Sequence, residues 1–154
     1  MRYLLDTGIL LRLVHPTDPQ HQDLVGALDR LKSRGDTFYC GMQNVAEFWN
    51  VTTRPATARG GLGLTPPEAH RRLAIIELAV EVLTDSAASY TEWKRLVVLH
   101  AVSGVQVHDA KLVALMNVER VTHLLTLKPS DFKRFAPLTT TTPGDVLAAP
   151  ANRP

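Results

Sequence analysis

The chain has 154 residues, of which 45% are hydrophobic and 21% are charged, and its 17 basic and 15 acidic side chains leave a net charge of +2. This length fits one domain, and this composition excludes a chain that is disordered throughout. No apolar run approaches the roughly 18 residues of a membrane-spanning helix. The single cysteine, Cys40, excludes an internal disulfide and a zinc site built on thiolates.

Short apolar runs alternate along the chain with segments in which apolar residues recur at helical spacing. The second helix is expected to open at Asp18-Pro19, with the proline at its first position, and to end at Gly35. A later helix begins at Thr65, where Glu68 completes the pattern of a capping box. In chain order, the expected elements are a strand at 2–5, helices at 9–14 and 18–34, a strand at 37–40, a helix at 43–53, a glycine-rich loop at 54–64, a helix at 65–79, a strand at 80–83, helices at 87–101 and 108–118, a strand at 122–126 and a candidate fifth strand at 138–142.

This alternation predicts βαβ units, and therefore an α/β fold in which helices cover both faces of a mostly parallel sheet of four to five strands. We expect one domain at residues 1–142. Residues 143–154 are rich in proline and alanine and are expected to form a flexible C-terminal tail, disordered or docked on a partner. Because Asp6 stands where a signal peptide needs its apolar centre, a cytoplasmic protein is expected.

Four acidic residues follow strands or open helices of this predicted sheet. Asp6 comes directly after the first strand, Glu47 lies on the helix after the second strand, Asp109 starts a later helix, and Asp131 follows the fourth strand. In a parallel sheet these places face one crevice. Carboxylates gathered there would repel one another and raise each other's pKa values unless cations neutralised them, and oxygen ligands select Mg²⁺ or Mn²⁺.

Each acid also has an ordinary structural explanation. Asp6 suits the N-cap of the following helix, and Asp109 suits the positive end of its own helix. Glu47 suits the exposed face of an amphipathic helix, and Asp131 suits a turn. A functional site is therefore indicated by the four acids occurring together and not by any one of them.

At these residues the sequence resembles the PIN-domain family, and more narrowly the VapC-type ribonuclease toxins of bacterial toxin–antitoxin pairs. The order and spacing of the matching segments over residues 1–140 carry the resemblance more than any one of them does. The matching segments are Leu4–Thr7, Gln43–Asn50, Val107–Ala114, and His123–Thr126 leading to Asp131.

The resemblance implies a three-layer α/β/α fold, a carboxylate cluster that holds Mg²⁺ or Mn²⁺, and cleavage of single-stranded or looped RNA. It also implies homodimers and a small antitoxin protein that covers the site. Asp6, Glu47 and Asp109 match the first three acidic positions of the family, and Thr126 matches the threonine that often closes the fourth strand.

Two positions depart from the family pattern. Gly8 stands where the family usually has Asn, a residue that supports the loop more often than it binds metal. Lys128 stands where the family normally has the Asp or Asn that completes the acidic site. Three outcomes are open: Lys128 points away while Asp131 or water takes over, its ammonium replaces a second metal ion, or the site is weakened and the protein serves mainly as an RNA- or antitoxin-binding module.

If the protein is an enzyme, we expect Asp6 and Asp109 to hold the metal ion, directly or through water. Glu47 would bind a metal-bound water or a second ion and help deprotonate the nucleophile. Thr126 would hold either Asp6 or a metal-bound water through its hydroxyl. Phosphates beside the cleft would meet basic residues in or near the glycine-rich segment. These RNA-binding candidates are Arg54, Arg59 and Arg72.

Two further classes of protein share parts of this pattern. The sequence Asp6-Thr7-Gly8 also occurs in retropepsin-type aspartic proteases, but their fold is nearly all β, and the helical segments here disfavour it. Response-regulator phosphoacceptors collect acids and a lysine at strand ends, but they need paired acids after the first strand, which here offers only Asp6.

Overall fold

The sheet of this protein has five strands, all parallel, in the order β3-β2-β1-β4-β5. The structure is a computed structural model that describes residues 1–150. β1 is central, and its backbone pairs with β2 on one side and β4 on the other. The strands are β1 (Arg2–Leu5), β2 (Thr37–Gly41), β3 (Glu81–Leu83), β4 (His123–Leu125) and β5 (Thr139–Thr141).

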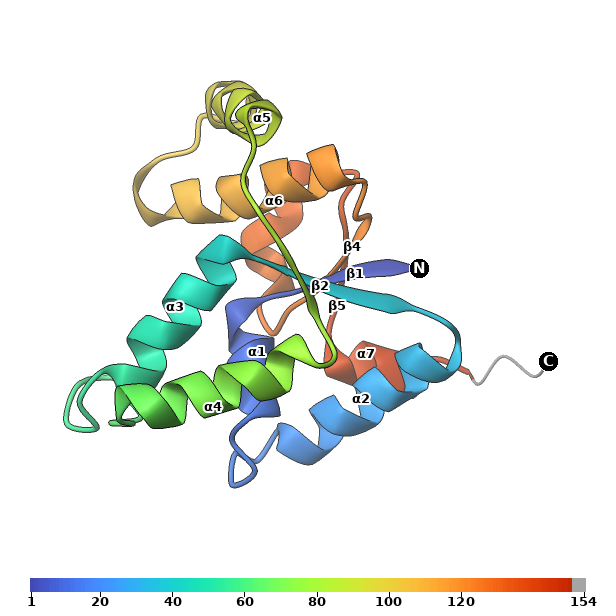
Figure 1. Cartoon of the computed structure of the whole chain (residues 1–154). Coiled ribbons are helices and arrows are strands. Elements are labelled where there is room, and N and C mark those ends of the chain that lie inside the picture. The colour runs from blue at the N-terminus through green and yellow to red at the C-terminus, as the bar shows by residue number, and fades with distance from the viewer. Residues whose placement is uncertain (151–154) are drawn as a thin grey trace.

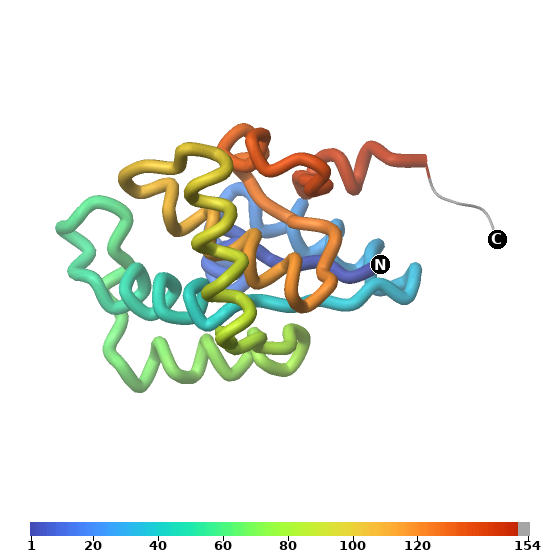
Figure 2. The backbone as a smooth tube through the Cα atoms, turned by 90° about the horizontal axis from the view of Figure 1, so that it is seen from above, coloured from blue at the N-terminus to red at the C-terminus, as the bar shows by residue number. Residues whose placement is uncertain are grey.

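Helices connect the strands and cover both faces of the sheet (Figures 1 and 2). Figure 1 shows α5 and α6 above the sheet and α1, α2, α4 and α7 below it. The helices are α1 (Thr7–Leu13), α2 (His21–Ser33), α3 (Met42–Thr53), α4 (Pro66–Glu77), α5 (Ala87–Leu99), α6 (Val107–Glu119) and α7 (Pro143–Ala148), with two 3-10 helices, η1 (Gly104–Gln106) and η2 (Pro129–Phe135).

Two hydrophobic cores lie on opposite faces of the sheet because successive side chains of a strand point to opposite sides. Leu5 and Leu125 belong to the core that α1, α2, α3, α4 and α7 cover. Leu4 and Leu124 belong to the core that α5, α6 and η2 cover. The predicted three-layer α/β/α fold with a parallel sheet is therefore confirmed, and all five expected strands are present.

Local signals in the sequence explain several helix boundaries. The predicted capping box at the start of α4 is present: the backbone N–H and the hydroxyl of Thr65 both donate to Glu68 Oε2, at 2.9 and 2.6 Å. Pro66 occupies the first turn. The start of α2 differs from expectation, because Asp18 Oδ1 accepts the N–H of Gln20 at 2.9 Å and forms a turn. Pro19 lies in that turn, and the helix begins two residues later, at His21.

The expected flexible tail from residue 143 needs correction over the part that the structure describes. Thr142 caps α7, and Val146 is 3% exposed within the core shared with α2. Arg30 of α2 donates from Nη1 to the carbonyl of Leu147 at 2.9 Å. The sequence pattern did not predict this short helix, because its buried residues, Pro143 and Val146, are too few to show a helical period. Residues 151–154 lie outside the described residues.

Over residues 1–150, none of the helices combines the length and the hydropathy that crossing a membrane would require.

Candidate active site

The centre of the site lies where β1 and β4 end side by side. Asp6 follows β1 directly, and its backbone N–H continues the parallel ladder by donating to the carbonyl of Leu125 at 3.0 Å. Thr126 follows β4 directly and is completely buried. The register of two neighbouring strands therefore brings together an acid and a hydroxyl that are 120 residues apart in sequence.

Both oxygens of Asp6 are held by hydrogen bonds. Oδ1 accepts the backbone N–H of Thr7 at 2.7 Å, which also makes Asp6 the N-cap of α1. Oδ2 accepts the hydroxyl of Thr126 at 2.7 Å, which is the first of the two roles expected for that hydroxyl. Burial raises the pKa of Asp6, and the hydrogen bonds from Thr126 and Thr7 oppose that effect. The N-cap and the site are thus two roles of one side chain.

Glu47 reaches the same place from α3. Its Oε2 accepts the hydroxyl of Thr7 at 2.6 Å, and its Oε1 accepts Nε2 of Gln43 from the preceding turn at 2.9 Å. Asn44 Nδ2 donates to the Thr7 hydroxyl at 3.1 Å, while its Oδ1 accepts the N–H of Gly41 at 2.9 Å. Thr7 therefore connects the two acids, because it donates its backbone N–H to one and its hydroxyl to the other.

Asp109 lies in the first turn of α6, beside this network. The pKa of Asp109 is raised to about 6, first by partial burial and then by the negative charges of Asp131, Asp6 and Glu47. The other three acids singled out in the sequence consequently act on the carboxyl group of Asp109. Gln43 also links α3 to this turn, because its Nε2 lies 3.2 Å from the carbonyl of His108. The charges of the predicted acids therefore act on one another, and their role as one metal site stays a prediction.

The carboxylate oxygens of these side chains are suitable ligands for a hard divalent cation, although the carboxylates do not form a tight cluster. Within residues 1–150, no group of three or more His, Cys, Asp or Glu side chains is close enough to hold a metal ion. Mg²⁺ usually keeps several waters and needs only one or two protein carboxylates. Asp6 and Asp109 could supply these two carboxylates. A cation bound by them would offset the negative charges that, together with burial, raise the pKa of Asp109.

Lys128 follows Thr126 by two residues, and its charge acts on Asp6. Its backbone N–H donates to the Thr126 hydroxyl at 3.1 Å, and its charge lowers the pKa of Asp6. Its side chain is exposed at the start of η2, the 3-10 helix that also carries Asp131. The site therefore includes one cation of its own.

The three arginines suggested as RNA contacts are placed differently from one another. Arg54 and Arg59 lie in the loop after α3, where Arg54 Nη1 donates to the carbonyl of Arg59 at 3.0 Å. Arg72 of α4 donates to the carbonyl of Val14, the C-cap of α1, at 2.5 Å. Arg72 thus has a structural partner, and an RNA-binding role for any of the three stays a prediction.

Three residues of the network were not predicted to support the acids: Thr7, Gln43 and Asn44. Asn44 is 1% exposed in the structure. Its sequence position did not suggest a role in the site, because asparagine is common in the first turn of a helix. The signal that was present is spacing: Gln43 precedes Glu47 by four residues and so lies on the same face of α3.

Comparison with known proteins supports this fold. Residues 3–136 match the model of the PIN domain, and the chain belongs to this family. A search of curated proteins found no match.

Solved structures resemble the chain over nearly its whole length at low sequence identity. VapBC2 from Rickettsia felis bound to a DNA fragment from its promoter has a TM-score of 0.71 at 17% identity, covering 92% of this chain and 98% of that one. VapBC-1 from nontypeable Haemophilus influenzae has a TM-score of 0.68 at 16% identity, covering 94% and 99%. VapC20 from Mycobacterium tuberculosis, a toxin that cleaves the sarcin-ricin loop, has a TM-score of 0.54 at 19% identity, covering 79% and 86%.

Proposed function

We propose that this protein is an Mg²⁺- or Mn²⁺-dependent endoribonuclease and the toxin of a type II toxin–antitoxin pair. The observation that carries the proposal is that Asp131, Asp6 and Glu47 lie near enough to Asp109 for their charges to add to the effect of its burial, which together raise the pKa of Asp109 to about 6. Membership of the PIN family and the VapBC complexes among the similar structures support it.

Each residue of the site has a distinct part in this proposal. Asp6 and Asp109 hold the divalent ion, which when bound supplies Lewis-acid stabilisation of the charge that develops on a phosphodiester. Glu47, oriented by Thr7 and Gln43, accepts the proton of the attacking water. Thr126 fixes the rotamer of Asp6 by its short hydrogen bond.

RNA and a small antitoxin protein are the proposed partners, and a homodimer is the proposed assembly. Two VapBC structures and the FitAB structure, which are similar to this chain in fold, are described as bound to DNA. VapC20 is described as cleaving the sarcin-ricin loop, which supports structured RNA as the substrate class here.

The test is cleavage of a pool of structured RNAs by the purified protein in Mg²⁺ or Mn²⁺. Asp6→Asn keeps the size of the side chain but removes a charge from the site, so we expect it to abolish cleavage, as EDTA should. Asp29→Asn, on the exposed face of α2, is the matched control and should cleave normally. Full activity of Asp6→Asn, or undiminished cleavage in EDTA, would refute the proposal.

A second candidate function is an RNA- or antitoxin-binding module with a weakened site. The position of Lys128 favours it, since this cation lies close enough to Asp6 to lower its pKa and so competes with a metal ion. It predicts binding without cleavage at any Mg²⁺ or Mn²⁺ concentration, and recovery of cleavage in Lys128→Asn. If the native protein cleaves and Lys128→Asn changes little, the binding-module alternative is excluded.

A further inference from the structure

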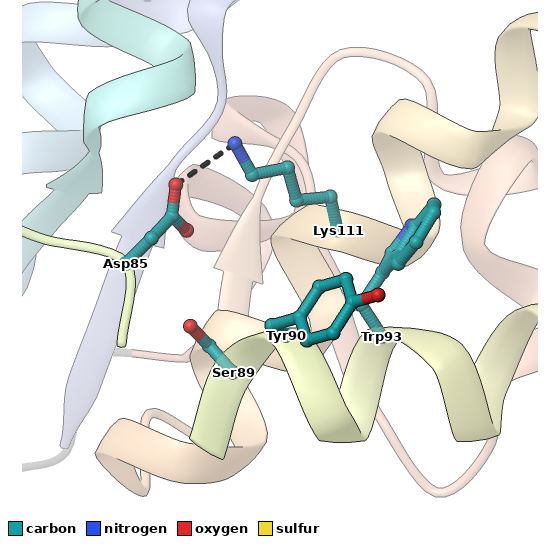
Figure 3. A pocket seen from close by; sticks show the side chains of 5 residues that line it. All are labelled: Asp85, Ser89, Tyr90, Trp93 and Lys111. Atoms are coloured by element: carbon teal, nitrogen blue, oxygen red, sulfur yellow. Dashed lines mark ion pairs between the residues drawn. The ribbon is translucent and has the colours of Figure 1, made fainter. Parts of the chain in front are cut away.

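A cavity of about 300 Å³ opens between α5 and α6. Figure 3 shows the side chains that line it, Asp85, Ser89, Tyr90, Trp93 and Lys111. The volume is at the lower end of the range for small-molecule sites, which suits one planar group and not a folded partner.

Two aromatic rings on one side of the cavity form a fixed stacking surface. The rings of Tyr90 and Trp93 are 6.1 Å apart between centroids and inclined by 29°. Trp93 is held by a hydrogen bond from Nε1 to the carbonyl of Val107 at 3.1 Å, whereas Tyr90 is 59% exposed. A rigid ring beside an exposed one offers a face on which a nucleobase can stack.

The other side of the cavity carries an ion pair with unused hydrogen-bonding capacity. Lys111 Nζ lies 2.8 Å from Asp85 Oδ2, and each side chain is 42% exposed. A pair this exposed stabilises a fold little. It does present a carboxylate acceptor beside an ammonium donor, and the Watson–Crick edge of guanine presents the complement: the donors N1–H and N2–H₂ beside the acceptor O6.

The cavity and the acidic site share the first turn of α6. Trp93 donates to the carbonyl of Val107, and Gln43 donates to the carbonyl of the next residue, His108. Asp109 follows immediately. The acidic site and the wall of the cavity therefore meet in the first turn of α6.

We propose that the cavity lined by Tyr90, Trp93, Asp85 and Lys111 binds an unpaired guanine base of RNA. The base stacks on the rings, its N1–H and N2–H₂ groups donate to Asp85, and its O6 accepts from Lys111. This inference rests on the proposed function only in taking RNA as the ligand.

The test measures binding without catalysis. Fluorescein-labelled 5′-UUUGUUU-3′ RNA, and the same RNA with A, C or U at the centre, are titrated with protein in EDTA and followed by anisotropy. We expect the guanine-containing RNA to bind about tenfold more tightly than the others. Tyr90→Ala should weaken all four RNAs, and Asp85→Asn should remove the preference for guanine. Val98→Ala, at an exposed position of the same helix, should leave both properties unchanged.

The outcomes separate this inference from the proposed function. Equal affinity for all four RNAs, a preference for another base, or binding that is insensitive to Tyr90→Ala would overturn the guanine site even if cleavage is observed. Guanine-dependent binding that Tyr90→Ala and Asp85→Asn reduce would establish the site even if the protein does not cleave RNA. Circular dichroism of each variant shows whether weaker binding reflects unfolding.

Discussion

Replacing Asp109 with asparagine should stabilise the protein at neutral pH. Asp109 has an ordinary pKa of 3.8 and a folded-state pKa of about 6, because burial and the charges of Asp131, Asp6 and Glu47 disfavour its ionised form. A difference of this size corresponds to about 3 kcal/mol. Since the side chain is partly exposed and solvent screens the charges, we expect about 1 kcal/mol to be realised.

The raised pKa of Asp109 also determines how the free energy of unfolding changes with pH. Between about pH 4 and pH 6 the folded chain binds more protons at Asp109 than the unfolded chain, so the free energy of unfolding falls as the pH rises through this window. Above about pH 6 the full cost of ionising Asp109 is present, and Asp109→Asn avoids it. Below pH 4 the carboxyl is protonated in both states, and the variant should lose its advantage.

Urea denaturation of the native chain and Asp109→Asn at pH 4 and pH 7.5, without divalent ions, measures the effect. At pH 7.5 the variant should also melt about 3 °C higher. Asp29→Asn, away from the site, controls for the loss of one negative charge. If Asp109→Asn is less stable at pH 7.5, or if its advantage grows in acid, the four acids do not repel one another as the structure indicates. Adding Mg²⁺ should stabilise the native chain and have less effect on the variant.

Three further substitutions test one hydrogen bond of the site and two positions in the hydrophobic core. Thr126→Val removes the hydroxyl that donates to Asp6 at 2.7 Å and should lower the free energy of unfolding by about 1–2 kcal/mol at pH 7 in urea titrations, with a smaller loss in acid as Asp6 protonates. Phe48→Ala empties a fully buried position and should cost about 3–5 kcal/mol in the same assay; a cost below 1 kcal/mol would mean that the core collapses around the gap. Val146→Asp places a charge beneath α7 and should cost about 3 kcal/mol, whereas Ala148→Asp, exposed on the same helix, should cost little; equal effects would show that α7 does not pack on the core.

The features that could be predicted from the sequence depend on residues close together in the chain or on a regular spacing of residue types. The capping box of Thr65 and Glu68 could be predicted because its two partners are three residues apart. The gathering of Asp6, Glu47 and Asp109 could be predicted because parallel strands align their carboxyl ends, whatever the details of packing. The bond from Thr126 to Asp6 follows from the same rule, once two strands are assigned as neighbours.

The remaining features depend on contacts that no local pattern encodes. The bond from Gln43 to the carbonyl of His108 needs α3 and α6 to meet at a particular depth. α7 buries Pro143 and Val146, which are too few to show a hydrophobic period, so its attachment through Arg30 could not be predicted from one. The turn at Asp18 competes with helix formation through its own side chain, which moved the start of α2 beyond Pro19.

The bond between Thr126 and Asp6 also sets a time at which the proposed ribonuclease becomes competent. Its two residues are 120 positions apart, and ribosomes add about 5–20 residues per second, so β4 leaves the ribosome about 6–24 s after β1. During that interval β1 lacks one of its neighbours, and for most of it Asp109 has not been made. The emerging chain therefore lacks the complete site while it is being made. Under the proposed function, cleavage of RNA would begin only after nearly all of the domain has left the ribosome.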